Sequence, residues 1–153
     1  MWSIERILVP LDGSALSERA LPVAESLASQ YSAEIMLLRV LDVPLPAQVP
    51  AHPESLWIQE ALQEHHREIE HYLTQQRTAL ESRGINTRVV VANAAPAEDI
   101  LFVAGSEAAD LIMMSSHGQG GSTRWGSGSV ADKVMQQSPC PVLLIRMAEV
   151  EID

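Results

Sequence analysis

Five runs of consecutive apolar residues divide the chain, and turn-forming or charged residues separate them. A run that lacks apolar and polar alternation is typical of a strand covered on both faces, as in a parallel sheet. We therefore predict strands at Ile4–Pro10, Ala33–Asp42, Ile85–Ala92, Asp110–Met114 and Pro141–Arg146.

Between these runs, apolar residues recur at helical spacing. Ser14 is a good N-cap for a helix whose apolar side comprises Ala20, Leu21, Val23, Ala24, Leu27 and Ala28. Pro22 falls several residues into this segment, which predicts an irregular first turn. A long amphipathic helix is expected from Glu54 to Arg83, with Gly84 as its stop. Shorter helices are predicted at Pro96–Gly105 and Val130–Gln137.

Strand and helix signals thus alternate from one end of the chain to the other, except for Val43–Pro53, where four prolines predict an extended excursion. This order predicts an α/β fold: one doubly wound domain over residues 1–153, with a five-stranded parallel sheet and helices on both faces. Such sheets bind ligands at the carboxyl ends of their strands, where the strand order reverses. Two loops compete for that place, Leu11–Ser14 and Ser115–Gly128.

The second loop is rich in glycine and serine and lies between a predicted strand and a predicted helix. Glycines allow positive φ and close backbone approach, and the first N–H groups of a helix attract anions. The donors are expected at Gly128, Ser129 and Val130. Composition alone is also compatible with a mobile Gly/Ser linker, although a phosphate-binding loop is favoured.

Composition narrows the classes of partner. The 153 residues are 46% hydrophobic, which is typical of a globular protein, and the formal net charge is −10. This acidity argues against nucleic-acid and anionic-membrane partners, so any phosphate must be held locally by N–H groups and one or two basic side chains. Glu5 and Arg6 interrupt the first apolar run, and no run reaches membrane-spanning length. We therefore expect a cytoplasmic protein without a membrane partner.

Several functional motifs are absent or misplaced. The chain contains no GxxxxGK[ST] and no GxSxG, and its only lysine is Lys133. Gly126–Ala131 matches GxGxxA, but that fingerprint belongs directly after a first strand. His66 and Glu70 are four residues apart on a predicted helix, an arrangement that more often marks a solvated face than a metal site. The lone Cys140, between two prolines, is more readily a small packing residue than a reactive thiol.

A resemblance to a known family covers essentially the whole chain. The nucleotide-binding members of the universal stress protein family carry the pattern G, two residues, G, nine residues, then G followed by S or T. Here the pattern is Ser115, two residues, Gly118, nine residues, then Gly128 and Ser129. The flanking stretches ILVPLDGS, LLRVLDV and SPCPVLLIR are also similar to the family.

The resemblance implies an adenine nucleotide alpha hydrolase-like fold that binds ATP or AMP, with Mg²⁺ possible on ATP. It implies the following contacts: adenine at Asp12 and Val40; ribose at Met114 and Ser115; phosphates at Gly118, Gly128, Ser129 and Val130. His117 and Arg124, in the same loop, are further candidates for the phosphates. The resemblance also implies a homodimer through Val142, Leu143, Leu144 and Ile145.

Ser115 departs from the family pattern, which has glycine at that position, and this departure bears on the strength of nucleotide binding. We expect a regulatory domain that binds ATP or AMP in the loop after the fourth predicted strand and acts through its dimer or partners, and two alternatives stay open. One is a slow ATP hydrolase, although the loop offers no evident base for water. The other is a stress scaffold without nucleotide, like family members that lack the glycines. Asp12 can also be plain turn chemistry before a helix.

Overall fold

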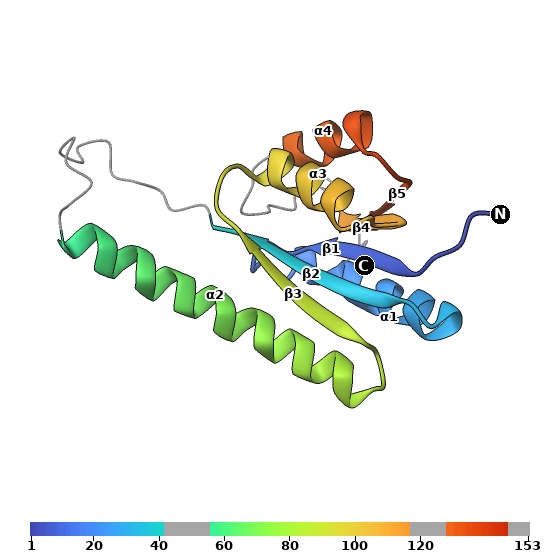
Figure 1. Ribbon diagram of the computed structural model, residues 1–153, viewed down its shortest axis with the longest axis horizontal. Coiled ribbons are helices and arrows are strands. Elements are labelled where there is room, and N and C mark those ends of the chain that lie inside the picture. The colour runs from blue at the N-terminus through green and yellow to red at the C-terminus, as the bar shows by residue number, and fades with distance from the viewer. Residues whose placement is uncertain (42–55, 117–127, 147–153) are drawn as a thin grey trace, which may run out of the picture.

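The computed structural model describes residues 1–41, 56–116 and 128–146 (Figure 1). The Pro-rich stretch 43–53 lies outside the described residues. The elements in chain order are β1 (Arg6–Pro10), the 3₁₀ turn η1 (Ser17–Arg19), α1 (Ala20–Tyr31), β2 (Glu34–Val40), α2 (Leu56–Ser82), β3 (Thr87–Ala92), α3 (Pro96–Ser106), β4 (Leu111–Ser115), α4 (Ser129–Gln137) and β5 (Val142–Ile145).

The five strands form one parallel sheet in the order β3-β2-β1-β4-β5. The chain therefore starts in the middle of the sheet, builds outward to β3, returns to the other side of β1 and builds outward to β5. This doubly wound parallel sheet confirms the predicted fold class.

Helices cover both faces of the sheet (Figure 1). The apolar sides of α1 and α2 pack against one face, in a buried cluster that includes Val9, Leu37 and Met113. On the other face, α3 and α4 pack against the alternate residues of the same strands, including Leu8, Leu38 and Ile112. The strands read as unbroken apolar runs because both of their faces are buried.

The start of the first helix differs from the sequence prediction. Ser14 Oγ accepts a hydrogen bond from the Ser17 N–H at 3.1 Å in the turn before η1, whose N-cap is Leu16, and α1 begins only at Ala20. The prediction that Ser14 is the N-cap of the α-helix is therefore wrong. Pro22 has no N–H to donate to the carbonyl of Glu18, which explains why regular α-helical bonding cannot begin earlier, as the expected irregular first turn anticipated.

The strand order reverses between β1 and β4, and the two strands are joined along only a short distance. They pair at Ile7 with Leu111 and at Leu8 with Ile112, whereas β1 and β2 pair over five consecutive residues. Beyond Leu8 the two strands part, and the chain leaves in opposite directions toward α1 and α4. This divergence at the carboxyl ends marks the switch point where such sheets bind ligands.

Among the helices that the structure describes, none is long and apolar enough to cross a membrane.

Candidate functional site

The loop after β1 is a compact turn held by its own side chains. Asp12 Oδ1 accepts a hydrogen bond from the Ser14 N–H at 2.8 Å, and Gly13 between them has a φ of +84°. Asp12 itself is only 2% exposed. Since a φ in this region strains any side chain with a Cβ, glycine is the residue that the turn requires here. The turn chemistry expected of Asp12 is therefore present.

Ser17 connects this turn to the end of β4. Its hydroxyl donates to the Ser14 carbonyl at 2.8 Å and accepts from the Asp12 N–H at 3.3 Å. On the other side of the switch point, Ser115 Oγ donates to the Ser17 carbonyl at 3.4 Å, a long and weak hydrogen bond. The structure thus brings the turn after β1 and the end of β4, the two loops that competed for the site in the sequence analysis, close to each other.

Val40 and Met114 form an apolar surface at the carboxyl ends of the strands. Val40 ends β2 and is fully buried, and Met114 is 3% exposed near the end of β4. Both belong to the cluster under α3 and α4. They can therefore support a flat apolar group above the strand ends, but their burial is also what any core would require.

The helix that follows the second loop begins with backbone donors that have no partner among the described residues. Gly128, with a φ of +84°, is the N-cap of α4, and no described side chain caps this helix. Asp132 donates the first intrahelical bond, to the Gly128 carbonyl, so the N–H groups of Ser129, Val130 and Ala131 precede the hydrogen-bonded turns. Together with the helix dipole, such donors favour an anion at this end of α4.

Ser116, next to the motif residue Ser115, was missed by the sequence reasoning. Its N–H donates to the Ile145 carbonyl, so it still follows the β4 ladder, and its hydroxyl oxygen is buried without a hydrogen-bond partner. Strand alternation turns this side chain to the face of Met114, which α3 and α4 cover. A buried polar atom with no partner is costly, which makes Ser116 Oγ a candidate contact for a ligand at this face.

Arg39 was also missed, although a charge inside the run LLRVL is a signal that the sequence carries. Its side chain is 5% exposed, and its guanidinium carbon lies 5.9 Å from the centre of the Tyr72 ring. Its Nη1 occupies the space beside Gly13, only 2.3 Å from where a Cβ on that glycine would lie. Arg39 therefore supports the Asp12 turn from within the protein.

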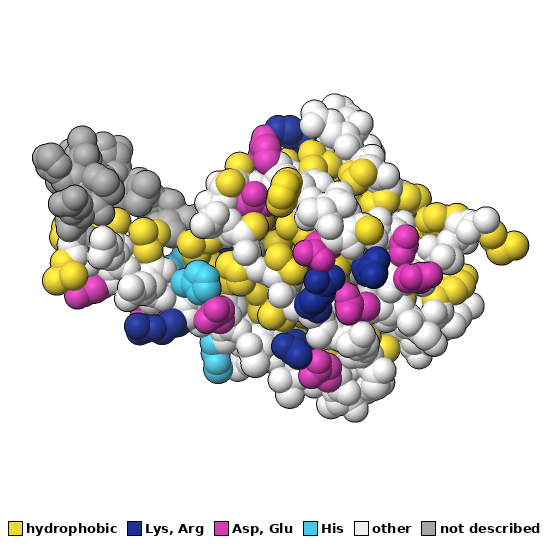
Figure 2. All heavy atoms as spheres, in the orientation of Figure 1, with side chains coloured by type: hydrophobic (Ala, Val, Ile, Leu, Met, Phe, Trp, Pro, Cys, Tyr) yellow, Lys and Arg dark blue, Asp and Glu magenta, His cyan; other side chains and the backbone are white. Residues whose placement is uncertain are grey.

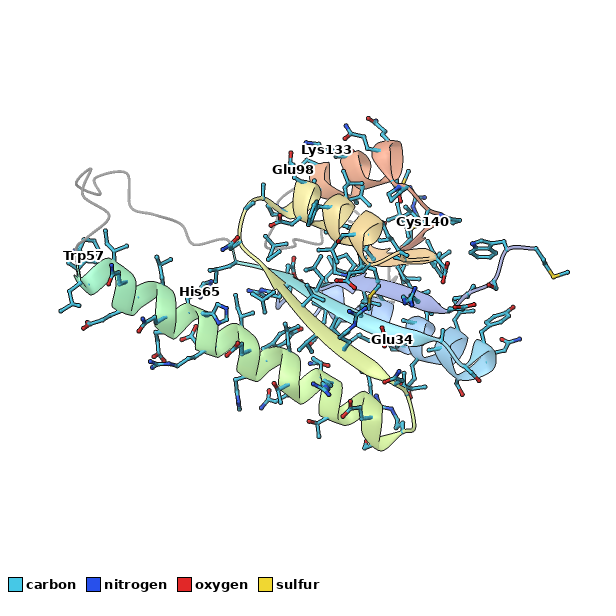
Figure 3. All side chains as sticks on the ribbon, viewed as in Figure 1. Glu34, Trp57, His65, Glu98, Lys133 and Cys140 are labelled. Carbon is cyan, nitrogen blue, oxygen red and sulfur yellow. The ribbon has the colours of Figure 1, made fainter. Side chains whose placement is uncertain are left out.

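Lys133 forms an ion pair with Glu98. Its ammonium group donates to Glu98 Oε1, which joins α4 to α3, and Figure 3 shows the two side chains next to each other. This ion pair lowers the pKa of the Glu98 carboxyl, chiefly through the hydrogen bond from Lys133. Three predicted phosphate contacts, His117, Gly118 and Arg124, lie outside the described residues.

The thiol of Cys140 is partly buried near the start of β5, where Ser138 Oγ donates to the Cys140 carbonyl at 2.6 Å. Burial raises the pKa of the thiol above its ordinary value, which disfavours the reactive thiolate. This environment agrees with a packing role.

The surface charge is mixed where it is visible. On the face shown in Figure 2, acidic and basic side chains lie interspersed rather than gathered into one basic patch. Arg88, for example, pairs with both Glu34 and Glu107, and the hydrogen bond to Glu107 is the main cause that raises its pKa.

A five-stranded doubly wound domain with a glycine-capped helix at its switch point is a class of α/β protein suited to anionic ligands. The sequence model of the universal stress protein family matches residues 3–146, and the chain belongs to that family. Universal stress protein MJ0531 of Methanocaldococcus jannaschii is 31% identical over 147 residues, covering 96% of this chain and 85% of the relative. Universal stress protein UspA from Lactobacillus plantarum has the same fold, with a TM-score of 0.77, 23% identity, and coverage of 94% of this chain and 99% of its own.

Two further universal stress proteins with this fold were solved with adenine nucleotides. One is in complex with cAMP, with a TM-score of 0.60 and 22% identity over 95% of this chain and 99% of that one. The other, from Archaeoglobus fulgidus, is in complex with dAMP, with a TM-score of 0.64 and 18% identity over 95% of this chain and 99% of that one.

Proposed function

We propose that this universal stress protein binds an adenine nucleotide, ATP or AMP, at the switch point between β1 and β4. One observation carries the proposal: the first turn of α4 has backbone N–H groups and no side-chain cap among the described residues. The Ser116 hydroxyl, just after the end of β4, supports it, because this oxygen is buried with no hydrogen-bond partner among the described residues. A phosphate suits both groups, because it accepts hydrogen bonds from a hydroxyl and from helix N–H groups.

The other predicted ligand contacts that the structure describes have a chemistry that suits the parts of the nucleotide assigned to them. The Asp12 turn and Val40 would hold the adenine, and Met114 and Ser115 the ribose. Gly128, Ser129 and Val130 would hold the phosphates. Among the residues outside the described part, Gly118, His117 and Arg124 stay predicted phosphate contacts. Mg²⁺ would be carried by ATP on its own phosphate oxygens, its preferred ligands.

The adenine nucleotides bound by the cAMP and dAMP complexes support the choice of base. The charge of this chain supports a small ligand rather than a nucleic acid, since a net charge of −10 repels a polyanion. A nucleotide is itself anionic, so its binding depends on the local donors described above.

We further propose that the protein is cytoplasmic and acts as a regulatory homodimer. β5 is the last strand of the sheet, and its outer edge carries backbone groups that another strand can pair with. A second copy of β5 would cover this edge in a symmetric pair, the commonest form of oligomer.

Titration calorimetry with ATP and with AMP, with and without Mg²⁺, tests the binding. Gly128→Val should weaken ATP binding about a hundredfold, because the β-branched side chain displaces the backbone donors from the phosphates. Gly84→Val is the matched control. Gly84 has a φ of +82° at the end of α2 with nothing within 4 Å, so this variant has the same backbone strain at a remote position. It should bind ATP like the wild type.

The two alternatives predict different results in the same experiments. A slow hydrolase would release phosphate from ATP with Mg²⁺, and this release would disappear in Gly128→Val. A scaffold without nucleotide would show no heat with either nucleotide, and native mass spectrometry of the purified protein would find no bound mass. Equal affinity in the wild type and Gly128→Val would place the site elsewhere.

A further inference from the structure

Arg39 is the one arginine on the described strands that is almost completely buried, at 5% exposure, and the proposed nucleotide contacts do not use it. A buried guanidinium is costly unless it is held by neighbouring groups, so a position that keeps one needs a physical reason. The reason lies at the turn after β1.

The guanidinium occupies the space that a side chain on Gly13 would fill. An ideal Cβ on Gly13 would lie 2.3 Å from Arg39 Nη1 and 3.2 Å from Cζ. Arg39 thus packs directly against the Asp12–Gly13 peptide from the protein side, while Gly13 itself is exposed on its other side. The turn cannot move inward without displacing this side chain.

The guanidinium is in turn held by α2. It lies 5.9 Å from the centre of the Tyr72 ring, within the range of a cation–π contact. Tyr72 Oη donates to Glu18 Oε1 at 2.9 Å, and Gln76 Nε2 donates to the same oxygen at 2.8 Å. Since Glu18 belongs to η1, this arrangement connects both ends of the turn segment to one helix.

We infer that Arg39 is a positioning residue: it holds the Asp12–Gly13 turn in the conformation that recognises the base of the nucleotide. The inference rests on the proposed function, and it concerns selectivity rather than phosphate binding. The proposed function assigns the base to this turn, where oxygens such as Asp12 Oδ1 accept hydrogen bonds, and acceptors suit the amino group of adenine. Inosine triphosphate (ITP) has a carbonyl oxygen in place of that amino group and would meet those acceptors unfavourably.

The test compares the Kd values of ATP and ITP in Arg39→Met, Arg39→Lys and the wild type. Arg39→Met should lower the preference for ATP over ITP about fivefold, the value of one hydrogen bond, with little change for ITP. Arg39→Lys should retain part of the preference. Arg83→Met is the matched control, because Arg83 pairs with Glu25 on the surface. An equal loss for both nucleotides would show a general structural role and overturn the inference, as would an unchanged preference.

A second variant displaces the guanidinium without removing it. Gly13→Ala places a methyl group where Nη1 now lies, and Gly84→Ala carries the same positive φ in open space. Gly13→Ala should lower the ATP preference as Arg39→Met does, and the double variant should lose little more, because both changes act on one contact. Additive losses would overturn the inference.

Hydrogen exchange of the nucleotide-free protein separates this inference from the proposed function. The amides of Gly13 and Ser14 should exchange faster in Arg39→Met than in the wild type, while those of β2 stay unchanged. If the wild type binds ATP but the amides of Gly13 and Ser14 exchange at the same rate in Arg39→Met, the role of Arg39 is overturned and the proposed function is not. If the wild type binds neither ATP nor ITP, the proposed function is overturned. The inferred recognition of the base by the Asp12–Gly13 turn is then overturned as well.

Discussion

Ser115 stands where the family pattern has glycine, and its hydroxyl donates to the carbonyl of Ser17. It is not among the residues with positive φ in the described part of the chain, so its backbone tolerates a side chain. In the proposed site, glycine at this position would leave room for the ligand. We predict that Ser115→Gly tightens ATP binding, by something on the order of 1 kcal/mol or about fivefold, because crowding is relieved and the lost hydrogen bond is weak.

The neighbouring hydroxyl should behave in the opposite way. Ser116→Ala is expected to weaken ATP binding about fivefold, because alanine lacks the buried hydroxyl that would donate a hydrogen bond to the phosphate. Parallel calorimetric titrations of the two variants and the wild type with ATP check both the expected rise and the expected fall in affinity. Weaker binding in Ser115→Gly would identify that serine as a ligand contact.

Individual site residues were predictable only where a motif or a loop position marked them. Gly128 and Asp12 could be found because glycine loops and Asp-Gly turns have sequence signatures. Ser116 and Ser17 have none: their roles depend on which side of the chain faces the neighbouring loop. Arg39 carried a signal, a charge in an apolar run, but its position against Gly13 required the packing of two distant segments.

At the scale of elements, α2 is joined to η1 by the hydrogen bond from Tyr72 to Glu18. Burial, and then this bond and the charge of Glu18, raise the pKa of Tyr72 above its ordinary value of 10.0. Above about pH 10 an unfolded tyrosine loses its proton while Tyr72 in the folded protein keeps it. The folded state then binds more protons than the unfolded state, so stability falls as the pH rises through this range.

We therefore predict that Tyr72→Phe makes the loss of stability above pH 10 shallower. The phenyl ring cannot ionise, so this residue no longer contributes to the pH dependence. At neutral pH the variant should be less stable by about 1 kcal/mol, the value of the lost hydrogen bond. Urea unfolding at a series of alkaline pH values measures both effects. A difference between the two proteins that stays constant through this pH range would contradict the raised pKa.

The proposed dimer makes a prediction for β5. The carbonyls of Pro141 and Ile145 accept hydrogen bonds from β4, so by alternation Leu143 also faces β4 and the N–H of Leu144 faces the outer edge. Leu144→Pro should leave a folded monomer, because the backbone donor that it removes points outward, although the variant also loses a side chain that packs against the cluster under α3 and α4. Leu143→Pro, the matched change one residue earlier, should destabilise the sheet itself. Sedimentation and circular dichroism check these outcomes, and a dimeric Leu144→Pro protein would exclude this interface.

The identity of the elements was predictable because long apolar runs and helical spacing are strong signals, but their ends were not. The second strand, expected to run from Ala33 to Asp42, is Glu34–Val40 in the structure. The first α-helix begins six residues after Ser14 because of the 3₁₀ turn and Pro22. Such ends depend on hydrogen-bond partners that a single segment does not reveal.

At the scale of the whole molecule, a ligand that binds only the folded state stabilises it. At a hundred times its Kd, ATP should add about 2.7 kcal/mol to the free energy of unfolding. For a chain of this size we expect a rise in Tm of roughly 5 to 10 °C. A thermal scan with and without ATP measures this, with Gly128→Val as the control that should show no rise. An equal rise in that variant would indicate binding at another place.

The place of the site was predictable at this scale because topology alone determines where a doubly wound sheet opens. The selectivity of the proposed site could not be predicted from topology, since it would depend on side chains such as Arg39, which reaches the turn from β2. The extent of the domain over residues 1–153 stays a prediction.

The short pairing of β1 with β4 has a mechanical consequence. The sheet is two panels, β3-β2-β1 and β4-β5, whose backbone seam comprises the pairs Ile7–Leu111 and Leu8–Ile112 and, at its closed end, the hydrogen bond from the Asp110 N–H to the Arg6 carbonyl. Side chains on both faces, such as Val9 with Met113 and Leu8 with Ile112, hold the panels together across that seam. Apolar packing is non-directional, so it resists separation of the panels better than it resists a small change in their angle. A ligand that contacts both the Asp12 turn and α4 would bridge the carboxyl ends of β1 and β4, where the strands diverge. It would therefore limit changes in the angle between the two panels.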